Sequence, residues 1–106
     1  MLARVQLPPT AKPGEVIEVR ITIQHPMETG FRFDLGGRPI PKNVISSLVA
    51  RYNGAEIFRA EMGSGIAANP YLQFCTVARQ SGEIEISWVD DAGNRGAEHA
   101  AISVIG

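Results

Sequence analysis

Hydrophobic and polar residues alternate along several segments of the chain, and the strongest alternation covers residues 16–24. Four apolar residues occupy every second position there: Ile17, Val19, Ile21 and Ile23. A period of two places one side of a strand in a core and the other in solvent. Pro26 follows at once and lacks a backbone donor, so we expect the strand to end near His25.

The same pattern predicts six further strands, at residues 3–7, 44–52, 56–60, 71–78, 84–88 and 97–105. Asn53-Gly54 stands between two of them and predicts a tight hairpin, because both residues accept a positive φ. No segment has the 3.6-residue period of a helix. The sequence therefore predicts an all-β fold, a seven-strand immunoglobulin-like β-sandwich, as a single domain over residues 1–106. Trp88 alternates with Ile84 and Ile86 and is predicted to lie in the core.

A long connection covers residues 25–43, and connections of this length are usually functional. Residues 31–35 alternate, and Gly36-Gly37 could turn them back on residues 38–40 as a hairpin. Met27 has two interpretations, a plug over the core or an adaptable contact for a partner, and the plug is favoured. If the strands simply alternate in direction, residues 25–30 and residues 69–71 form one surface at the same end of the sandwich. Residues 61–68 are expected to form a loop.

Composition excludes some classes of function. The 106 residues carry a formal net charge of −1, so there is no basic surface of the kind that nucleic acid requires. No apolar run approaches the roughly 20 residues of a membrane-spanning helix. The first five residues show no apolar signal region, which by itself would predict a cytoplasmic protein.

Candidate catalytic and metal-binding residues are few. His25, His99 and Cys75 fall short of the three or four clustered ligands that a zinc or iron site takes, and superoxide reductase, a sandwich of similar size, uses four histidines and a cysteine. Cys75 lies in an apolar strand and is expected to be a packed small residue, not a nucleophile. Asp90 and Asp91 have the composition of a solvated turn. His25 either fixes the turn through a loop carbonyl or lies near a partner, and the sequence favours neither.

Several short motifs follow one another along the chain: HPMETG at 25–30, then KNVI, YNG, ANPYLQF, SG, and WVDD with a following glycine. With these motifs the chain resembles the SoxZ family, a subunit of the SoxYZ sulfur-carrier complex of thiosulfate-oxidising bacteria. The resemblance covers nearly the whole chain, from Arg4 to the last strand. HPMETG and ANPY are specific together, whereas either alone would be weak.

The resemblance implies a non-catalytic subunit without a cofactor, which holds SoxY as a heterodimer and helps to dock it transiently to other Sox enzymes. In such complexes the sulfur-carrying cysteine belongs to a glycine-rich tail of SoxY, Gly-Gly-Cys-Gly-Gly, and this chain has no such tail. The resemblance also implies a periplasmic location, reached by export of the folded chain together with SoxY, which carries the signal. The alternative is a stand-alone extracytoplasmic immunoglobulin-like binding module.

The partner surface is predicted at the long connection and the loop before the fifth strand. Its candidate residues are His25, Met27, Glu28, Thr29, Phe31, Phe33, Asn69 and Tyr71. A subunit that is built to pair leaves an apolar face or a sheet edge exposed, so the chain without SoxY is expected to self-associate weakly.

Overall fold

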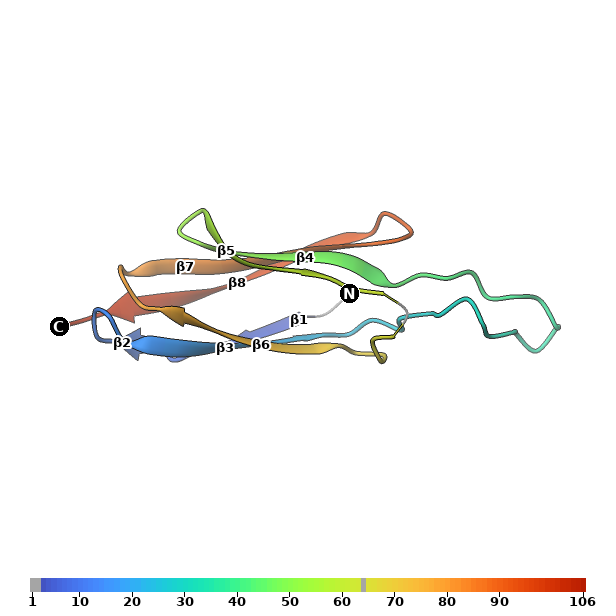
Figure 1. The fold of residues 1–106 in the computed structure, drawn as a ribbon, viewed down its shortest axis with the longest axis horizontal. Coiled ribbons are helices and arrows are strands. Elements are labelled where there is room, and N and C mark those ends of the chain that lie inside the picture. The colour runs from blue at the N-terminus through green and yellow to red at the C-terminus, as the bar shows by residue number, and fades with distance from the viewer. Residues whose placement is uncertain (1–2, 64) are drawn as a thin grey trace.

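The computed structural model describes residues 3–63 and 65–106, and within them it shows two β-sheets packed face to face (Figure 1). One sheet has the strand order β1-β3-β6, formed by β1 (Ala3–Gln6), β3 (Val16–Ile23) and β6 (Tyr71–Val77). The other has the order β2-β8-β7-β4-β5, formed by β2 (Thr10–Ala11), β4 (Ile45–Tyr52), β5 (Ala55–Glu61), β7 (Gly82–Asp90) and β8 (Arg95–Val104). The predicted all-β sandwich is therefore confirmed.

Within residues 3–63 and 65–106 the structure has eight strands, where the sequence predicts seven. The additional strand, β2, is two residues long and pairs in parallel with the end of β8. It escapes a pattern search because Pro8-Pro9 interrupts the chain just before it and two residues are too few to show a period. These prolines stand where the chain leaves the three-stranded sheet after β1 and joins the five-stranded sheet at β2.

Two of the sequence predictions include residues that the structure does not describe. Ser64, inside the expected loop 61–68, lies outside the described residues, as do Met1 and Leu2 at the expected signal-free N-terminus. Over the part of the chain that is described, no helix has the length and apolar character needed to cross a bilayer.

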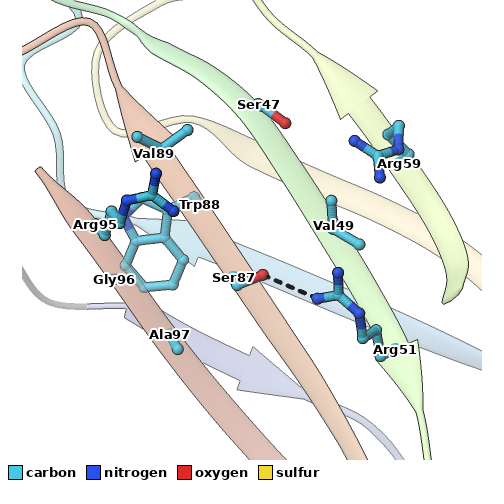
Figure 2. Close-up of a pocket in the computed structure, with 10 residues that line it drawn as sticks. All are labelled: Ser47, Val49, Arg51, Arg59, Ser87, Trp88, Val89, Arg95, Gly96 and Ala97. Carbon is cyan, nitrogen blue, oxygen red and sulfur yellow. Dashed lines mark hydrogen bonds between the residues drawn. The ribbon is translucent and has the colours of Figure 1, made fainter. Parts of the chain in front are cut away.

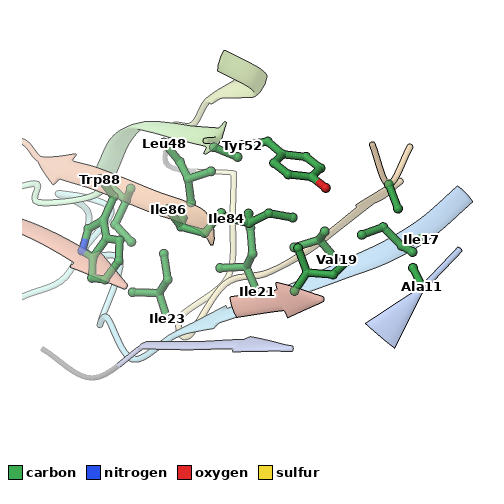
Figure 3. Close-up of a cluster of buried hydrophobic side chains, with 14 of the residues drawn as sticks. Ala11, Ile17, Val19, Ile21, Ile23, Leu48, Tyr52, Ile84, Ile86 and Trp88 are labelled. Atoms are coloured by element: carbon green, nitrogen blue, oxygen red, sulfur yellow. The ribbon is translucent and has the colours of Figure 1, made fainter. Parts of the chain in front are cut away.

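The core lies between the two sheets and is built from the side chains that the alternation places inward (Figure 3). The four isoleucine and valine residues of β3 at 17, 19, 21 and 23 are buried, as are Ile84 and Ile86 of β7. Trp88 is also buried, as predicted. Gly96, its neighbour on β8, makes room for the indole, since a Cβ built on Gly96 would lie 2.3 Å from Trp88 Cζ2.

Two irregularities in the five-stranded sheet change which residues share a face. Between β4 and β7 the register moves past Ser46, so that Ile45 and Leu48, three residues apart, are both buried. Between β4 and β5 it moves past Ile57, so that Arg59 stays opposite Val49 on the outer face. Asn53 and Gly54 both have positive φ, which confirms the predicted hairpin turn.

Candidate functional site

The most prominent feature outside the sandwich is residues 28–43, which we call the arm. Figure 1 shows the arm extending well beyond the end of both sheets, and the molecule measures 60 × 19 × 18 Å. At its base the backbone N–H groups of Glu28 and Asn43 donate to each other's carbonyl oxygens, both at 2.9 Å. Further out, Asp34 N–H donates to Arg38 O at 2.9 Å, and Phe33 faces Pro39. The hairpin predicted at residues 31–40 is confirmed.

The tip of the arm displays three large apolar side chains. Phe31 is 83% exposed, Phe33 is 66% exposed and Leu35 is fully exposed. Phe31 and Phe33 are two residues apart along the chain as it approaches the Phe33–Pro39 bridge, so their side chains lie on the same side of it. Leu35 lies in the turn that Gly37 N–H closes on Asp34 O at 3.0 Å. Leu35 was not among the predicted site residues, although it completes the alternation just before Gly36-Gly37 and could have been found by that signal. The tip is therefore an apolar surface held away from the core.

The arm is anchored by a buried cluster that we call the root, made of His25, Met27, Asn43, Asn69 and Asp90. His25 is buried, and its ring bridges two partners: Nδ1 accepts a hydrogen bond from Met27 N–H at 2.9 Å, and Nε2 lies 3.1 Å from Asp90 Oδ2. Because Nδ1 accepts, the ring proton is on Nε2, which donates to the carboxylate. Of the two interpretations of His25, the structure bears out its role in fixing the turn, with a backbone N–H and Asp90 as the partners in place of a loop carbonyl.

Met27 is a plug over the core, as the sequence favoured. Its side chain is only 3% exposed, and Ile45 N–H points at Met27 Sδ across 3.3 Å. Its φ of +50° lies in the left-handed region, which non-glycine residues adopt only when the surroundings compensate the strain. Both side chains are enclosed by the sandwich that they close. Whether either residue contacts a partner stays a prediction.

The expectation that Asp90 lies in a solvated turn is wrong. It is the buried last residue of β7, not part of a solvated turn. Burial on its own raises the pKa of Asp90, but hydrogen bonds from Asn94, His25 and Asn43 outweigh it and lower the pKa to about 2. Asp91 is partly exposed, accepts a hydrogen bond from Val44 N–H and lies 3.8 Å from Lys42 Nζ. Both aspartates thus hold the arm to the sheet.

The two predicted surface segments meet at the root. Asn69 N–H donates to His25 O at 2.8 Å, and His25 N–H donates to Asn69 Oδ1 at 3.1 Å. This confirms that residues 25–30 and 69–71 lie at one end, as strand alternation predicted. Tyr71 is about half exposed at the start of β6, and its hydroxyl donates to Gln73 Oε1 at 3.0 Å.

Glu28 and Thr29 act within the arm. Glu28 Oε1 accepts a hydrogen bond from Arg32 Nη1 at 2.7 Å, and Thr29 Oγ1 accepts one from Phe31 N–H at 3.2 Å. These local contacts stiffen the first half of the arm. Whether Glu28, Thr29, Phe31, Phe33, Asn69 and Tyr71 contact a partner stays a prediction.

Cys75 is exposed, and the expectation of a packed residue is wrong. It lies on β6 opposite Glu18 of β3, on the outer face of the three-stranded sheet, while its neighbour Phe74 packs against the core and stacks on Phe58 with ring centroids 4.5 Å apart. The apolar neighbours in the sequence belong to the other side of the strand. Within residues 3–63 and 65–106, His, Cys, Asp and Glu side chains form no group of three or more that could hold a metal ion.

Comparison with known proteins gives one family and one fold. The family model described as "Sulphur oxidation protein SoxZ" matches residues 5–101. No curated protein matches the chain. Among solved structures, a superoxide reductase (neelaredoxin) from Ignicoccus hospitalis is 16% identical over 99% of this chain and 81% of its own, with a TM-score of 0.76. A Thermotoga maritima protein provisionally named a superoxide reductase is 15% identical over 98% of this chain and 86% of its own, with a TM-score of 0.74. At these identities the likeness shows the shared sandwich fold alone.

Proposed function

Because the chain belongs to the SoxZ family of sulphur oxidation proteins, we propose that it is the non-catalytic partner subunit of a SoxYZ sulfur carrier. It holds SoxY, which carries sulfur intermediates on a C-terminal cysteine, and it helps to dock that carrier transiently to the other enzymes of the pathway. We propose further that it acts in the periplasm, after export of the folded chain together with SoxY. Family membership supports the sulfur-oxidation role, and the arm supports the partner role.

The observation that carries the partner role is the apolar tip. Soluble monomers rarely hold several large apolar side chains together in water, and such groups mark interaction surfaces. Full burial of one such side chain is worth about 1.5–3 kcal/mol, and aromatic side chains are frequent hot spots of protein interfaces. Phe31, Phe33 and Leu35 therefore offer a partner three apolar anchors on one small element.

The root makes the arm an efficient docking element. Met27 and His25 are buried where the arm starts, and Asn43 and Asp91 tie its return to the sheet. A segment that is already ordered loses less conformational entropy when it binds. The stiff base and the apolar tip together suit a subunit that stays bound to one partner.

Co-expression with the SoxY of the same genome tests this proposal. The tagged chain should co-purify with SoxY as a heterodimer. The triple variant Phe31→Ser, Phe33→Ser, Leu35→Ser should bind at least about tenfold more weakly, about 1.4 kcal/mol, because it removes all three anchors.

A matched control is the double variant Val16→Ser, Ile105→Ser, which removes exposed apolar side chains at the other end of the sandwich and should bind as wild type does. If the wild-type chain does not co-purify with SoxY, the partner role is wrong. If the triple variant binds as tightly as wild type, SoxY docks elsewhere on the molecule.

A further inference from the structure

A hollow on the outer face of the five-stranded sheet, on the side away from the core, has no role in the function proposed above. It measures about 580 Å³ and is lined by ten residues of β4, β5, β7 and β8 (Figure 2). Three of the ten are arginines, Arg51, Arg59 and Arg95, and none is acidic. The chain as a whole has a net charge of −1, so this concentration of positive charge is a local property of the sheet.

Strand register places two of the arginines close together. Val49 of β4 faces Arg59 on β5 and Ser87 on β7, and Arg51 is the next outward residue along β4. At about 4.8 Å between strands and about 3.3 Å per residue, the Cα atoms of Arg51 and Arg59 are about 8 Å apart. Figure 2 shows the two side chains on either side of Val49, whereas Arg95 lies farther across the sheet. One small ligand above Val49 is within reach of both.

The donors around Val49 are the guanidinium groups of Arg51 and Arg59 and the hydroxyl of Ser87, and strand register also places Glu56 and Glu85 opposite Arg51. Arg51 Nη1 lies 3.4 Å from Ser87 Oγ; when the hydroxyl accepts this hydrogen bond, its own proton is free for a ligand. Arg59 Nη2 is held by Glu56 Oε1 at 2.7 Å, but both side chains are about half exposed, and such pairs contribute little. Arg59 can therefore exchange Glu56 for a ligand. The floor of small side chains, Val49 and Ala97, leaves room for that ligand above the sheet.

We propose that this hollow binds one tetrahedral oxyanion, held by the guanidinium groups of Arg51 and Arg59 and by the hydroxyl of Ser87. A guanidinium presents two parallel N–H groups that match two oxygens of such an anion, and a hydroxyl can serve a third. Arg95 adds attraction over a longer range. The choice of a sulfur oxyanion rests on the function proposed above. The anion is either free sulfate or thiosulfate, or the sulfonate end of an adduct on the carrier cysteine.

Amide NMR titration of the isolated chain tests the site. Sodium sulfate and sodium thiosulfate should give saturable shifts at the amides of Val49 and Ser87, and sodium chloride at the same ionic strength should not. Arg51→Gln and Arg59→Gln should each weaken binding by about tenfold or more. The affinity of Arg51→Lys should fall between those of Arg51→Gln and wild type, because lysine keeps the positive charge but lacks the two parallel N–H groups of a guanidinium.

Arg4→Gln, on exposed β1 of the other sheet, is the control and should bind as wild type does. Arg51 is half-buried, and should Arg51→Gln fail to fold, the exposed Arg59→Gln gives the same test. Equal shifts in chloride, or undiminished binding in folded Arg59→Gln, would overturn the proposal.

Two peptides separate the sources of the anion. A Gly-Gly-Cys-Gly-Gly peptide with an S-sulfonated cysteine should compete with sulfate if the hollow receives the carrier-bound adduct, and its free-thiol form should not. If sulfate and thiosulfate bind but the S-sulfonated peptide does not compete, the hollow is a site for the free anions. If no oxyanion binds, the hollow has no such role, and the partner role still stands or falls on co-purification with SoxY.

Discussion

The root and the tip of the arm each contain large apolar residues, which are buried in the root and exposed at the tip. Met27 is 3% exposed, whereas Phe31, four residues later, is 83% exposed. Met27 lies where the two sheets end and can fill the gap between them. Phe31 lies in the arm, which extends beyond the end of both sheets (Figure 1). An apolar residue in a loop is therefore a plug or a contact surface according to what lies beneath it, and its neighbours in the sequence do not decide which.

Truncation of Met27 should cost the most stability. Met27→Ala should lower the free energy of unfolding by about 2–5 kcal/mol, because it leaves a cavity at the end of the core. Phe31→Ala, the matched change at the tip, should stay within about 0.5 kcal/mol of wild type. Denaturant titration with comparison of midpoints at an unchanged slope measures both. If Met27→Ala kept the stability of wild type but bound SoxY weakly, Met27 would be a partner contact and not a plug over the core.

The charge in the root provides a second test, through pH. The pKa of Asp90 is lowered from 3.8 to about 2 in the folded protein, so its stabilising effect is present above about pH 4 and is lost as the pH falls toward 2. At about 1.4 kcal/mol for each unit of pKa, the effect is about 2 kcal/mol. The stability difference between wild type and Asp90→Asn should narrow by this amount over that range. Parallel pH profiles of the two proteins would show that Asp90 is not the titrating group.

The smallest expected effect concerns the tip in the absence of a partner. The exposed tip, and the unpaired edges of strands such as β5 and β6, should allow weak self-association at high concentration. The triple serine variant at residues 31, 33 and 35 should self-associate less, because it removes the apolar anchors and leaves the edges. Sedimentation velocity across a concentration series measures both proteins. A wild-type chain that stays strictly monomeric would contradict this prediction.

Strand alternation was sufficient to predict much of the fold. The seven predicted strands agree with the observed ones to within two residues at either end, and the inward residues of β3 and β7 are buried as expected. The Asn53-Gly54 turn and the fold-back of the arm were also predicted, since each depends on residues close together in the chain. At the candidate site, the same local logic located the arm and two of its three exposed apolar residues.

Tertiary structure decided the features that depend on residues far apart in the chain. Asp90 is buried because His25, 65 positions earlier, supplies one of its hydrogen bonds, and no local pattern indicates that pairing. Cys75 is exposed because β6 turns the other side of the strand toward the core. The arginine hollow joins β4, β5, β7 and β8 through strand register and one bulge, so its residues form no motif in the sequence. The sequence determines the period of each strand, because that period is a property of neighbouring residues, whereas contacts between strands exist only once the two sheets have packed.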